Sequence, residues 1–431
     1  MPTRYTRDTF DSFRVLPWEI DGATVRLHYA LDDALHFTET LTLPVEVHDI
    51  DAVRGIVDLL AVAAGTSYFK VAAPQRALVD CGPLSSAGRA VARALYDDGL
   101  REFATVNGLD VPLVTDLHAP EGTPVFPLPA SDRPLVPCGG GRDSTLLASV
   151  LADRSPYLVS IKANPYVDRL GAMWGLEVGR VQRTIDRQLV ELNAGPAMNG
   201  HVPVTAINGL ISVLTAAATG CGAVAMANER SASVPSRILA DGTPVNHQYS
   251  KSVEFEGLLR AALGDGVNWF SALRPWSELA IARAVAHRHL VPHIMSCNRA
   301  FTVHRTASTG WCRECDKCRF VFLTLAPFCP RDELVAAFGG DLLADGSPAN
   351  IDGFDELCQE QRPFDCVGEA DEARAAVTLL ADGVWSRHPV VHTLLTRYGR
   401  LPEARVHELL EPAGDHHVPA AYLDLLTPVL A

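Results

Sequence analysis

The sequence predicts an α/β protein with a central parallel sheet covered by helices on both faces. From about residue 130 to 330, short apolar runs alternate with amphipathic helical segments, which is the pattern of successive strand–helix units. One run, Pro134-Leu135-Val136-Pro137-Cys138, leads directly into three glycines and a helical segment. A strand at the ligand-binding edge of such a sheet ends in this way.

The other elements follow from local periodicity. In the central region we expect strands at 157–162, 223–227, 269–273 and 292–297, and helices at 144–152, 207–219 and 277–289. Residues 1–125 form a predicted α+β domain with strands at 24–31 and 37–45 and helices at 51–64 and 87–106. A Pro-rich linker is expected at 120–134, a catalytic domain at 130–330, and a mostly helical region at 331–431.

The bulk composition is that of a globular protein. The chain has 431 residues, of which 48% are hydrophobic and 20% are charged, so two or three domains are expected. A formal net charge of −14 argues against nucleic-acid binding. We find no signal-peptide pattern and no apolar run of membrane-spanning length, so a cytoplasmic location without membrane association is expected. The oligomeric state is not predicted.

A phosphate-binding loop is predicted at Gly139-Gly140-Gly141-Arg142-Asp143-Ser144. Glycines let the backbone approach a ligand closely, and the free amides of the following helix bind phosphate. The hydroxyls of Ser144 and Thr145 can donate to phosphate oxygens. The loop resembles the SGGxDS motif of the PP-loop ATP pyrophosphatases, with Gly139 in place of the usual Ser. This resemblance implies a Rossmann-like, adenine nucleotide α-hydrolase-like sheet and cleavage of ATP to AMP and pyrophosphate.

Two polar clusters follow the buried strand at 223–227. The first, Asn228-Glu229-Arg230-Ser231, lies at the same sheet edge as the loop and is expected to contact the nucleotide or substrate. The second covers residues 246–252 and is rich in proton-transfer groups, although a polar loop that caps a helix would look similar. Magnesium ligands are expected among Glu229, Glu254 and Glu256.

Four of the ten cysteines are close in sequence and form a candidate metal site. Cys297, Cys312, Cys315 and Cys318 have a spacing that can close a tetrahedral zinc site, which with four thiolates would be structural. Free thiols on a surface turn and an iron–sulfur cluster are the alternatives.

These motifs together resemble one family, the UDP-N-acetyl-α-D-muramoyl-L-alanyl-L-glutamate epimerases of bacterial peptidoglycan synthesis. The resemblance rests on the glycine loop and on the segments 228–231, 245–252, 311–318 and 364–369, with weaker likeness at 10–13 and 65–70. It implies inversion of the terminal L-glutamate of a UDP-linked muramoyl dipeptide, with ATP and Mg²⁺ as cofactors. Residues 1–125 are expected to contact the UDP-sugar part.

The implied chemistry assigns roles to the polar clusters. Adenylation of the glutamate carboxylate would make the Cα proton acidic enough for removal by a base. His247, Tyr249 and Lys251 are the candidates for proton transfer, Arg230 is a further catalytic candidate, and Cys138 is a weaker one. Another PP-loop enzyme, such as an amide- or nitrile-forming ligase or a tRNA-modifying enzyme, and a non-catalytic ATP sensor remain alternatives.

Overall fold

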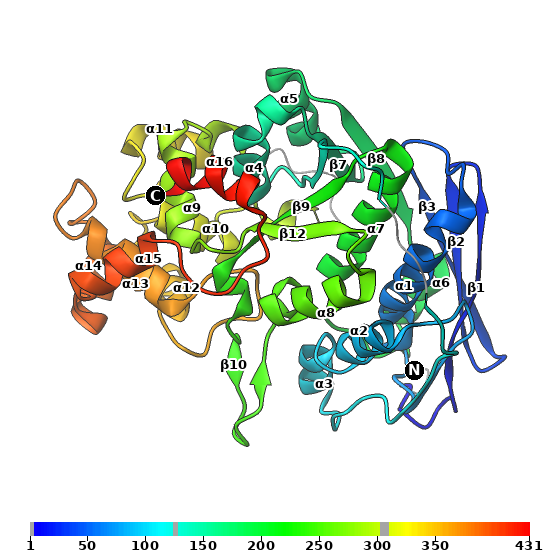
Figure 1. The fold of residues 1–431 in the computed structure, drawn as a ribbon. Helices are drawn as coiled ribbons and strands as arrows, with labels where there is room; N and C mark the ends of the chain where they lie inside the picture. The colour runs from blue at the N-terminus through cyan, green and yellow to red at the C-terminus, as the bar shows by residue number, and fades with distance from the viewer. Residues whose placement is uncertain (1–3, 124–127, 302–309) are drawn as a thin grey trace.

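The fold is built around one mixed ten-stranded β-sheet with helices on both faces (Figure 1). The computed structural model describes residues 4–123, 128–301 and 310–431. In chain order the strands of the sheet are β1 (Phe13–Asp21), β2 (Thr24–Leu31), β3 (Leu35–Thr42), β4 (Arg76–Val79), β5 (Asp116–His118), β6 (Pro134–Pro137), β7 (Tyr157–Ile161), β8 (Val178–Thr184), β9 (Ala223–Glu229) and β12 (Asn268–Leu273). They lie side by side in the order β12-β9-β6-β7-β8-β3-β2-β1-β4-β5. The predicted α/β class is confirmed.

The five strands from β12 to β8 are all parallel and form the centre of the sheet. The chain enters this group at β6, adds β7 and β8 on one side, and then returns to add β9 and β12 on the other side. The strand order therefore reverses between β6 and β9. The carboxyl ends of these two strands mark the switch point at which open α/β sheets bind ligands.

The prediction of a strand at 292–297 is wrong, and the fifth parallel strand is instead β8. That stretch begins in a short 3-10 helix, Val291–His293, and continues without regular structure. Pro292 has no N–H to give to a sheet ladder. The segment instead packs against the glycine loop, where the backbone N–H of Met295 donates to the carbonyl of Gly140 over 2.7 Å.

The N-terminal strands extend the same sheet. β1, β2 and β3 form an antiparallel meander, and β3 pairs with β8, so the meander continues directly into the parallel strands. β4 and β5 add parallel strands beyond β1. Residues 1–125 thus combine strands and helices as predicted, but their sheet is shared with the central region. Part of the predicted linker, residues 124–127, lies outside the described residues.

Two helical layers bury the faces of the sheet. On one face lie α1 (Ile50–Phe69), α2 (Ser86–Tyr96), α7 (Val204–Thr219) and α8 (Val253–Leu263); on the other lie α4 (Arg142–Val150), α5 (Pro165–Trp174) and α9 (Glu278–His287). Alternate residues of β9 enter the two cores: Ala223 and Ala225 face α4 and α9, whereas Val224 and Met226 face α1 and α7. This period of two is that of a strand buried on both sides.

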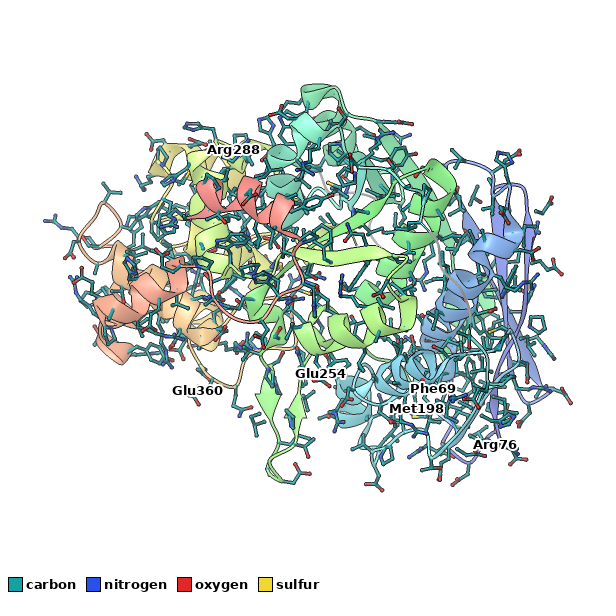
Figure 2. All side chains as sticks on the ribbon, viewed as in Figure 1. Phe69, Arg76, Met198, Glu254, Arg288 and Glu360 are labelled. Carbon is teal, nitrogen blue, oxygen red and sulfur yellow. The ribbon has the colours of Figure 1, made fainter. Side chains whose placement is uncertain are left out.

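Helix α1 is long and apolar enough to cross a membrane by length and composition. In the fold, 89% of its most apolar window is buried, and Phe69 at its end is fully enclosed (Figure 2). Arg76, which begins β4 a few residues later, is exposed at the outer edge of the molecule. The helix therefore packs as a core helix of this fold.

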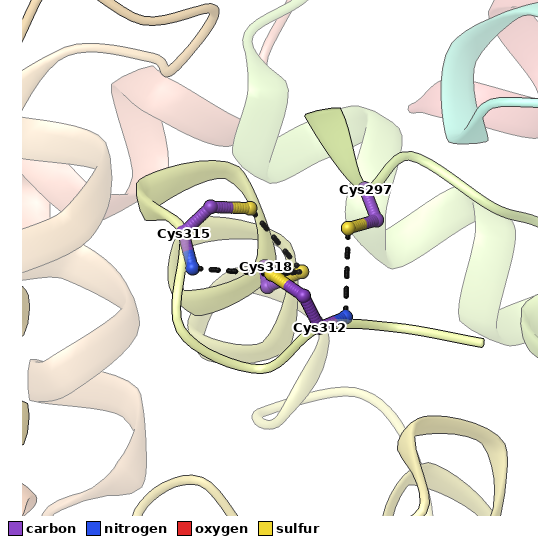
Figure 3. Close-up of side chains that lie close together, drawn as sticks. All are labelled: Cys297, Cys312, Cys315 and Cys318. Atoms are coloured by element: carbon purple, nitrogen blue, oxygen red, sulfur yellow. Dashed lines mark hydrogen bonds between the residues drawn. The ribbon is translucent and has the colours of Figure 1, made fainter. Parts of the chain in front are cut away.

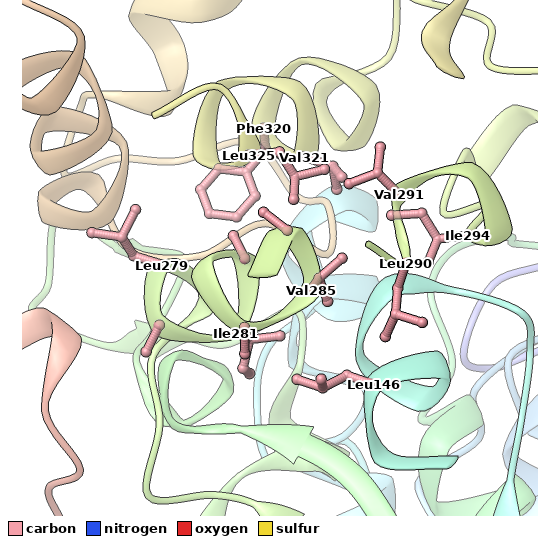
Figure 4. Packing of buried hydrophobic residues seen from close by; sticks show 14 of the residues in the cluster. Leu146, Leu279, Ile281, Val285, Leu290, Val291, Ile294, Phe320, Val321 and Leu325 are labelled. Atoms are coloured by element: carbon pink, nitrogen blue, oxygen red, sulfur yellow. The ribbon is translucent and has the colours of Figure 1, made fainter. Parts of the chain in front are cut away.

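The remaining helices are α3 (Arg101–Asn107), α6 (Arg187–Asn193), α10 (Asp316–Leu325), α11 (Arg331–Phe338), α12 (Pro348–Leu357), α13 (Ala370–Leu380), α14 (Pro389–Tyr398), α15 (Glu403–Leu410) and α16 (Ala420–Leu430). Those after residue 331 form the predicted helical region. Figure 4 shows how α9 is enclosed, with Ile281 and Val285 near Leu146 of α4, and Phe320 and Val321 of α10 on its other side.

A buried ion pair joins the meander to the parallel strands. Arg183 of β8 donates two hydrogen bonds, of 2.6 and 3.2 Å, to the carboxylate of Glu39 on β3, which is fully buried. The hydroxyl of Tyr68 on α1 donates to the same carboxylate over 3.1 Å. Because a buried carboxylate needs partners, this contact fixes how β3 meets β8.

We expect Arg183→Met to lower the free energy of unfolding by about 3–5 kcal/mol, because Glu39 would remain buried without its cation. Arg187→Met is the matched control, since Arg187 forms an exposed pair with Glu191 one helical turn away. That change should stay within about 0.5 kcal/mol. Thermal and urea unfolding followed by circular dichroism would measure both, and equal small effects would contradict the structural role of the pair.

Candidate functional site

The glycine loop at the end of β6 is held by two other segments. The side-chain amide of Asn164, at the start of α5, donates to the carbonyl of Gly139 over 2.7 Å. From the segment after α9, the N–H of Met295 donates to Gly140, and the hydroxyl of Ser296 accepts from the N–H of Arg142 over 3.0 Å. The loop is therefore preformed by the fold.

Gly140 has a backbone conformation that requires glycine. Its φ is +70°, and a Cβ at this position would lie 2.7 Å from the Cβ of Tyr166. Gly139, one residue earlier, has open space around the position of a Cβ. The sharp turn at Gly140 aims the following amides along the axis of α4 toward the switch point.

The start of α4 presents polar groups for an anion. No side chain caps α4, whose N-cap residue is Gly141. The hydroxyl of Thr145 is buried and has no hydrogen-bond partner among the described residues, and the hydroxyl of Ser144 makes long contacts with the carbonyl of Gly141, at 3.4 Å, and the thiol of Cys138, at 3.7 Å. The amides and hydroxyls of residues 142–145 thus form a ready anion site.

Arg142 turns away from this anion site. Its guanidinium is buried and forms ion pairs with Asp143, at 2.8 Å, and with Glu278 of α9. Glu278 also binds the ammonium of Lys317 on α10 at 3.3 Å. Burial would raise the pKa of Asp143, but the positive charges of Arg142, Lys317 and Lys251 lower it overall. Asp143 is therefore a carboxylate at neutral pH.

The side chains of the segment after β9, residues 228–231, have different roles: some hold neighbouring elements together, and one remains available as a ligand. The amide of Asn228 donates to Ser271 on β12 over 3.0 Å, and the hydroxyl of Ser231 donates to Glu372 on α13 over 2.5 Å. Arg230 points toward the C-terminal helices, where it donates to the carbonyl of Glu411. Glu229 is buried, and its Oε1 has no hydrogen-bond partner among the described residues. Glu229 therefore offers a buried ligand atom.

Part of the segment 246–256 serves as a helix cap, the alternative that the sequence left open. The hydroxyl of Ser252 accepts from the N–H of Phe255 and caps α8. The carboxylate of Glu256 accepts from the backbone of Ser271 and forms a buried ion pair with Arg274. These groups hold the segment in place, so Glu256 has no oxygen left over as a magnesium ligand.

Tyr249 and Glu254 lie together at a different place. The hydroxyl of Tyr249 donates to Glu254 over 3.1 Å, and both line a cavity of about 250 Å³ together with Asp98 and Arg101. Figure 2 labels Glu254 at the start of α8. The structure thus places Tyr249 apart from the hydrogen bonds of His247 and Lys251.

His247 and Lys251 belong to a half-buried polar group that also contains Cys366 and Glu102. The Nδ1 of His247 donates to Glu102 on α3 over 2.5 Å, and the ring also hydrogen-bonds to Cys366. Burial opposes the charge on His247, but these two hydrogen bonds raise its pKa to about 10. Lys251 donates to Gln248 over 2.9 Å. Burial opposes its charge as well, but the Cys366, Glu229 and Asp143 charges raise its pKa. Both cations are therefore protonated at neutral pH.

The N-terminal region adds His201 and Lys70 to this group. The rings of His201 and His247 lie 4.2 Å apart between centroids. Burial and the charges of His247, Lys251 and Lys70 lower the pKa of His201 to about 3, so it is neutral. The ammonium of Lys70 binds the amide oxygen of Asn199 at 2.5 Å and the carbonyl of Gly200 at 3.4 Å, and it forms no ion pair among the described residues. Burial lowers its pKa to about 8.

Sequence reasoning missed several of these residues. Cys366 and Lys317 lie inside motifs that carry the family resemblance, so a signal for them existed. Glu102, His201 and Glu278 are single polar residues in otherwise ordinary segments, and only the fold brings them to the site. Cys138, the weaker candidate, is buried with its thiol 3.7 Å from the hydroxyl of Ser144.

The four predicted metal-binding cysteines converge at the start of α10 (Figure 3). Their sulfur atoms all lie within 4.8 Å of one another; Cys318 is 3.4 Å from Cys315 and 3.7 Å from Cys312. Cys297 joins them through the N–H of Cys312, which donates to its sulfur. In a tetrahedral zinc site with Zn–S bonds of about 2.3 Å, the sulfurs are about 3.8 Å apart. The arrangement fits such an ion.

Fold and site together define a doubly wound α/β enzyme with a glycine loop at the switch point and a half-buried group of ionisable side chains. The chain belongs to the MurL family. The family model for the MurL N-terminal domain matches residues 4–272, and the model for the MurL C-terminal domain matches residues 293–408. The family resemblance predicted from the sequence is therefore confirmed.

Three curated relatives match nearly the whole chain, and each is named UDP-N-acetyl-alpha-D-muramoyl-L-alanyl-L-glutamate epimerase. The protein from a Micromonospora species is 41% identical, over 99% of this chain and 100% of its own. The protein from Salinispora tropica is 40% identical, over 99% and 97%, and that from Xanthomonas oryzae pv. oryzae is 35% identical, over 97% and 97%. No solved structure matches the chain.

We expect Gly140→Ala and Gly139→Ala to differ sharply. Gly140→Ala should lower the free energy of unfolding by at least about 1–2 kcal/mol, because a left-handed conformation with a Cβ is strained and the new methyl meets Tyr166. Gly139→Ala should stay within about 0.5 kcal/mol, because its Cβ enters open space. Thermal unfolding of the two purified variants measures this, and equal stability would contradict the loop geometry.

Proposed function

We propose that this protein inverts the terminal L-glutamate of UDP-N-acetylmuramoyl-L-alanyl-L-glutamate to D-glutamate during the synthesis of peptidoglycan precursors. The names of three relatives that match nearly the whole chain support this substrate. The observation that best supports an inversion is the half-buried group of His247, Lys251 and Cys366, in which Lys251 also interacts with Asp143 of the glycine loop. ATP and nucleotide-linked sugars are available in the cytoplasm, where we place the reaction.

ATP is the proposed activating co-substrate, bound at the loop 139–144 as in PP-loop enzymes. The parallel strand order with its switch point at this loop supports the proposal, and so does the buried Thr145 hydroxyl without a partner among the described residues. Asp143 and Glu229 would hold Mg²⁺, since both are buried or half-buried carboxylates at this edge of the sheet. When bound, the ion would neutralise phosphate charge.

Activation explains why an inversion would need ATP. A Cα proton beside a free carboxylate is very weakly acidic, because the carbanion would place two negative charges side by side. Adenylation removes one of these charges and lets the electron pair delocalise into an enolate. Water then releases AMP from the inverted product. The charges of Lys251 and of Asp143 in the loop act on each other, which supports a role for the Lys251 ammonium beside such an intermediate.

The four predicted catalytic side chains take different places in this mechanism. Lys251 is a buried, protonated amine, and we assign it the return of a proton to the opposite face of the enolate. The ring of His247 is oriented by its hydrogen bond to Glu102, and His247 acts together with the side chains around it. Tyr249 and Arg230 direct their polar atoms to Glu254 and Glu411, so the mechanism gives them no step.

The substrate carries a second carboxylate on the glutamate side chain, and Lys70 is the proposed partner. Its buried ammonium is bonded only to the oxygens of Asn199 and Gly200 among the described residues. A buried cation without a counter-ion favours an anionic ligand. Lys70 lies near His201 and so at the same group of side chains.

With the L-Ala-L-Glu nucleotide, ATP and Mg²⁺ in D₂O, the product should be D-glutamate that carries deuterium at Cα. Ser144→Ala should slow AMP formation at least about 100-fold, because one donor to the phosphate is lost. Ser386→Ala, a partly exposed serine of the helical region, is the control and should react normally. Chiral analysis, mass spectrometry and AMP assays give the readouts.

Other outcomes of this experiment point to other functions. Inversion at full rate without ATP would overturn the activation step. AMP formation without inversion would favour an amide-forming ligase or a related adenylating enzyme. Tight ATP binding without any AMP, with substrate present, would favour a nucleotide sensor.

We also propose that Cys297, Cys312, Cys315 and Cys318 hold a structural zinc ion. The distances among their sulfurs support this, and four thiolates leave no position open for catalysis. The ion would join the segment after α9, which contacts the glycine loop, to the start of α10. Its role would be to fix the position of the loop relative to Lys317.

The freshly purified protein should contain about one zinc per chain. Cys315→Ser should lose the ion and unfold at lower temperature, because structural zinc contributes folding free energy. Cys329→Ser is the control, since Cys329 is a buried thiol outside the cluster. Elemental analysis of the three proteins tests the idea; wild-type protein without zinc would refute it, and iron in its place would favour the cluster alternative.

A further inference from the structure

Cys366, between α12 and α13, is a thiol to which no step has yet been assigned. Its backbone N–H donates to its neighbour Asp365 over 2.6 Å, and Asp365 also accepts from the side chain of Asn298. These contacts fix the backbone. The residue as a whole is partly exposed. The His247 ring lies beside the thiol, where its hydrogen bond and charge lower the pKa of Cys366, and Glu102 holds the ring through its Nδ1.

This order of groups, carboxylate to imidazole to thiol, is that of an activated cysteine. The three residues come from three distant parts of the chain, α3, the segment before α8, and the segment before α13. A structural role alone would not require a histidine whose ring is buried between a carboxylate and a thiol. The geometry points to a prepared thiolate.

We propose that Cys366 is the base that removes the Cα proton of the activated glutamate, and that Glu102 and His247 position and ionise it. The proposal rests on the proposed function. The Cα–H bond breaks, an S–H bond forms, and the electron pair enters the enolate of the adenylate. The Lys251 ammonium then gives a proton to the opposite face, and exchange with solvent returns Cys366 and Lys251 to their starting states.

The charges around the sulfur agree with this role. Burial would raise the pKa of Cys366, but the Lys251 charge, the hydrogen bond and charge of His247, and Lys317 together lower it to about 7. A base is most effective when its pKa lies near the working pH. His247 cannot be the base itself, because its raised pKa of about 10 keeps it protonated at neutral pH.

The first test is chemical and does not depend on turnover. Alkylation of Cys366 by iodoacetamide, followed by peptide mass spectrometry, should rise with pH with a midpoint near 7. Cys81 is the internal control, a partly exposed thiol whose pKa is raised by burial and by Asp58. Glu102→Gln and His247→Gln should each shift the Cys366 midpoint upward and slow alkylation at pH 7 by about tenfold or more. A midpoint unchanged in both variants would overturn the pairing.

The second test separates the base from the activation step. Cys366→Ala should still form AMP or the adenylate from the L-Ala-L-Glu nucleotide and ATP, but exchange of the Cα proton in D₂O should fall about 10²–10⁴-fold. Cys81→Ser should exchange at the wild-type rate. Loss of AMP formation and exchange together in a folded Cys366→Ala, or exchange near the wild-type rate, would overturn the proposal.

The same readouts distinguish failure of the proposed function. If the wild type shows no ATP-dependent inversion, the function is wrong, while the alkylation profile still reports on the thiolate. The possible metal-ligand atoms of Glu102, His201 and His247 also lie within 4.8 Å of one another. A second metal ion in the wild type that is lost in His247→Gln would show that His247 serves a metal and would overturn its role beside Cys366.

Discussion

One buried carboxylate connects the parts of this site. Glu278, at the start of α9, is fully buried and pairs with Arg142 of the glycine loop and with Lys317 of α10. Its backbone N–H donates to Glu372 on α13 over 2.8 Å. Because a buried charge is stable only when it is paired, the loop, the cysteine-rich segment and the helical region must assemble around it together. The position of the loop is thus a property of the whole fold.

Much of the central fold was accessible from the sequence because it rests on local patterns. Apolar runs predict the strands at 223–229 and 268–273, and glycines predict the loop at 139–144. The strand at 178–184 was missed because Arg180 and Gln182 leave no continuous apolar run. That strand meets the antiparallel meander, and its partner β3 lies more than 130 residues away in sequence, so its pairing has no local signal.

The residues of the candidate site also fall into those that a sequence motif predicts and those that only the fold brings together. His247 and Lys251 were accessible because they stand in one dense polar motif. Glu102 and His201 come from elements without any motif, and only packing brings them to His247. Arg230 and Tyr249 stand in the motifs as well, but the orientation of a side chain cannot be read from its type. The residue types of a segment indicate whether it can contribute to a functional site, whereas the fold determines which of its side-chain atoms come into contact.

The site also crosses the boundary between the two domains that the family models recognise. Residues 4–272 contain the glycine loop, Glu102, His247 and Lys251, whereas residues 293–408 contain Lys317, Cys366 and Glu372. Neither half has a complete set of charges, and each would leave buried ionised groups without partners. Each half therefore depends on the other for the partners of its ionised groups. A gene fission, or an exchange of one half between distant relatives, would separate residues whose charges are mutually compensating.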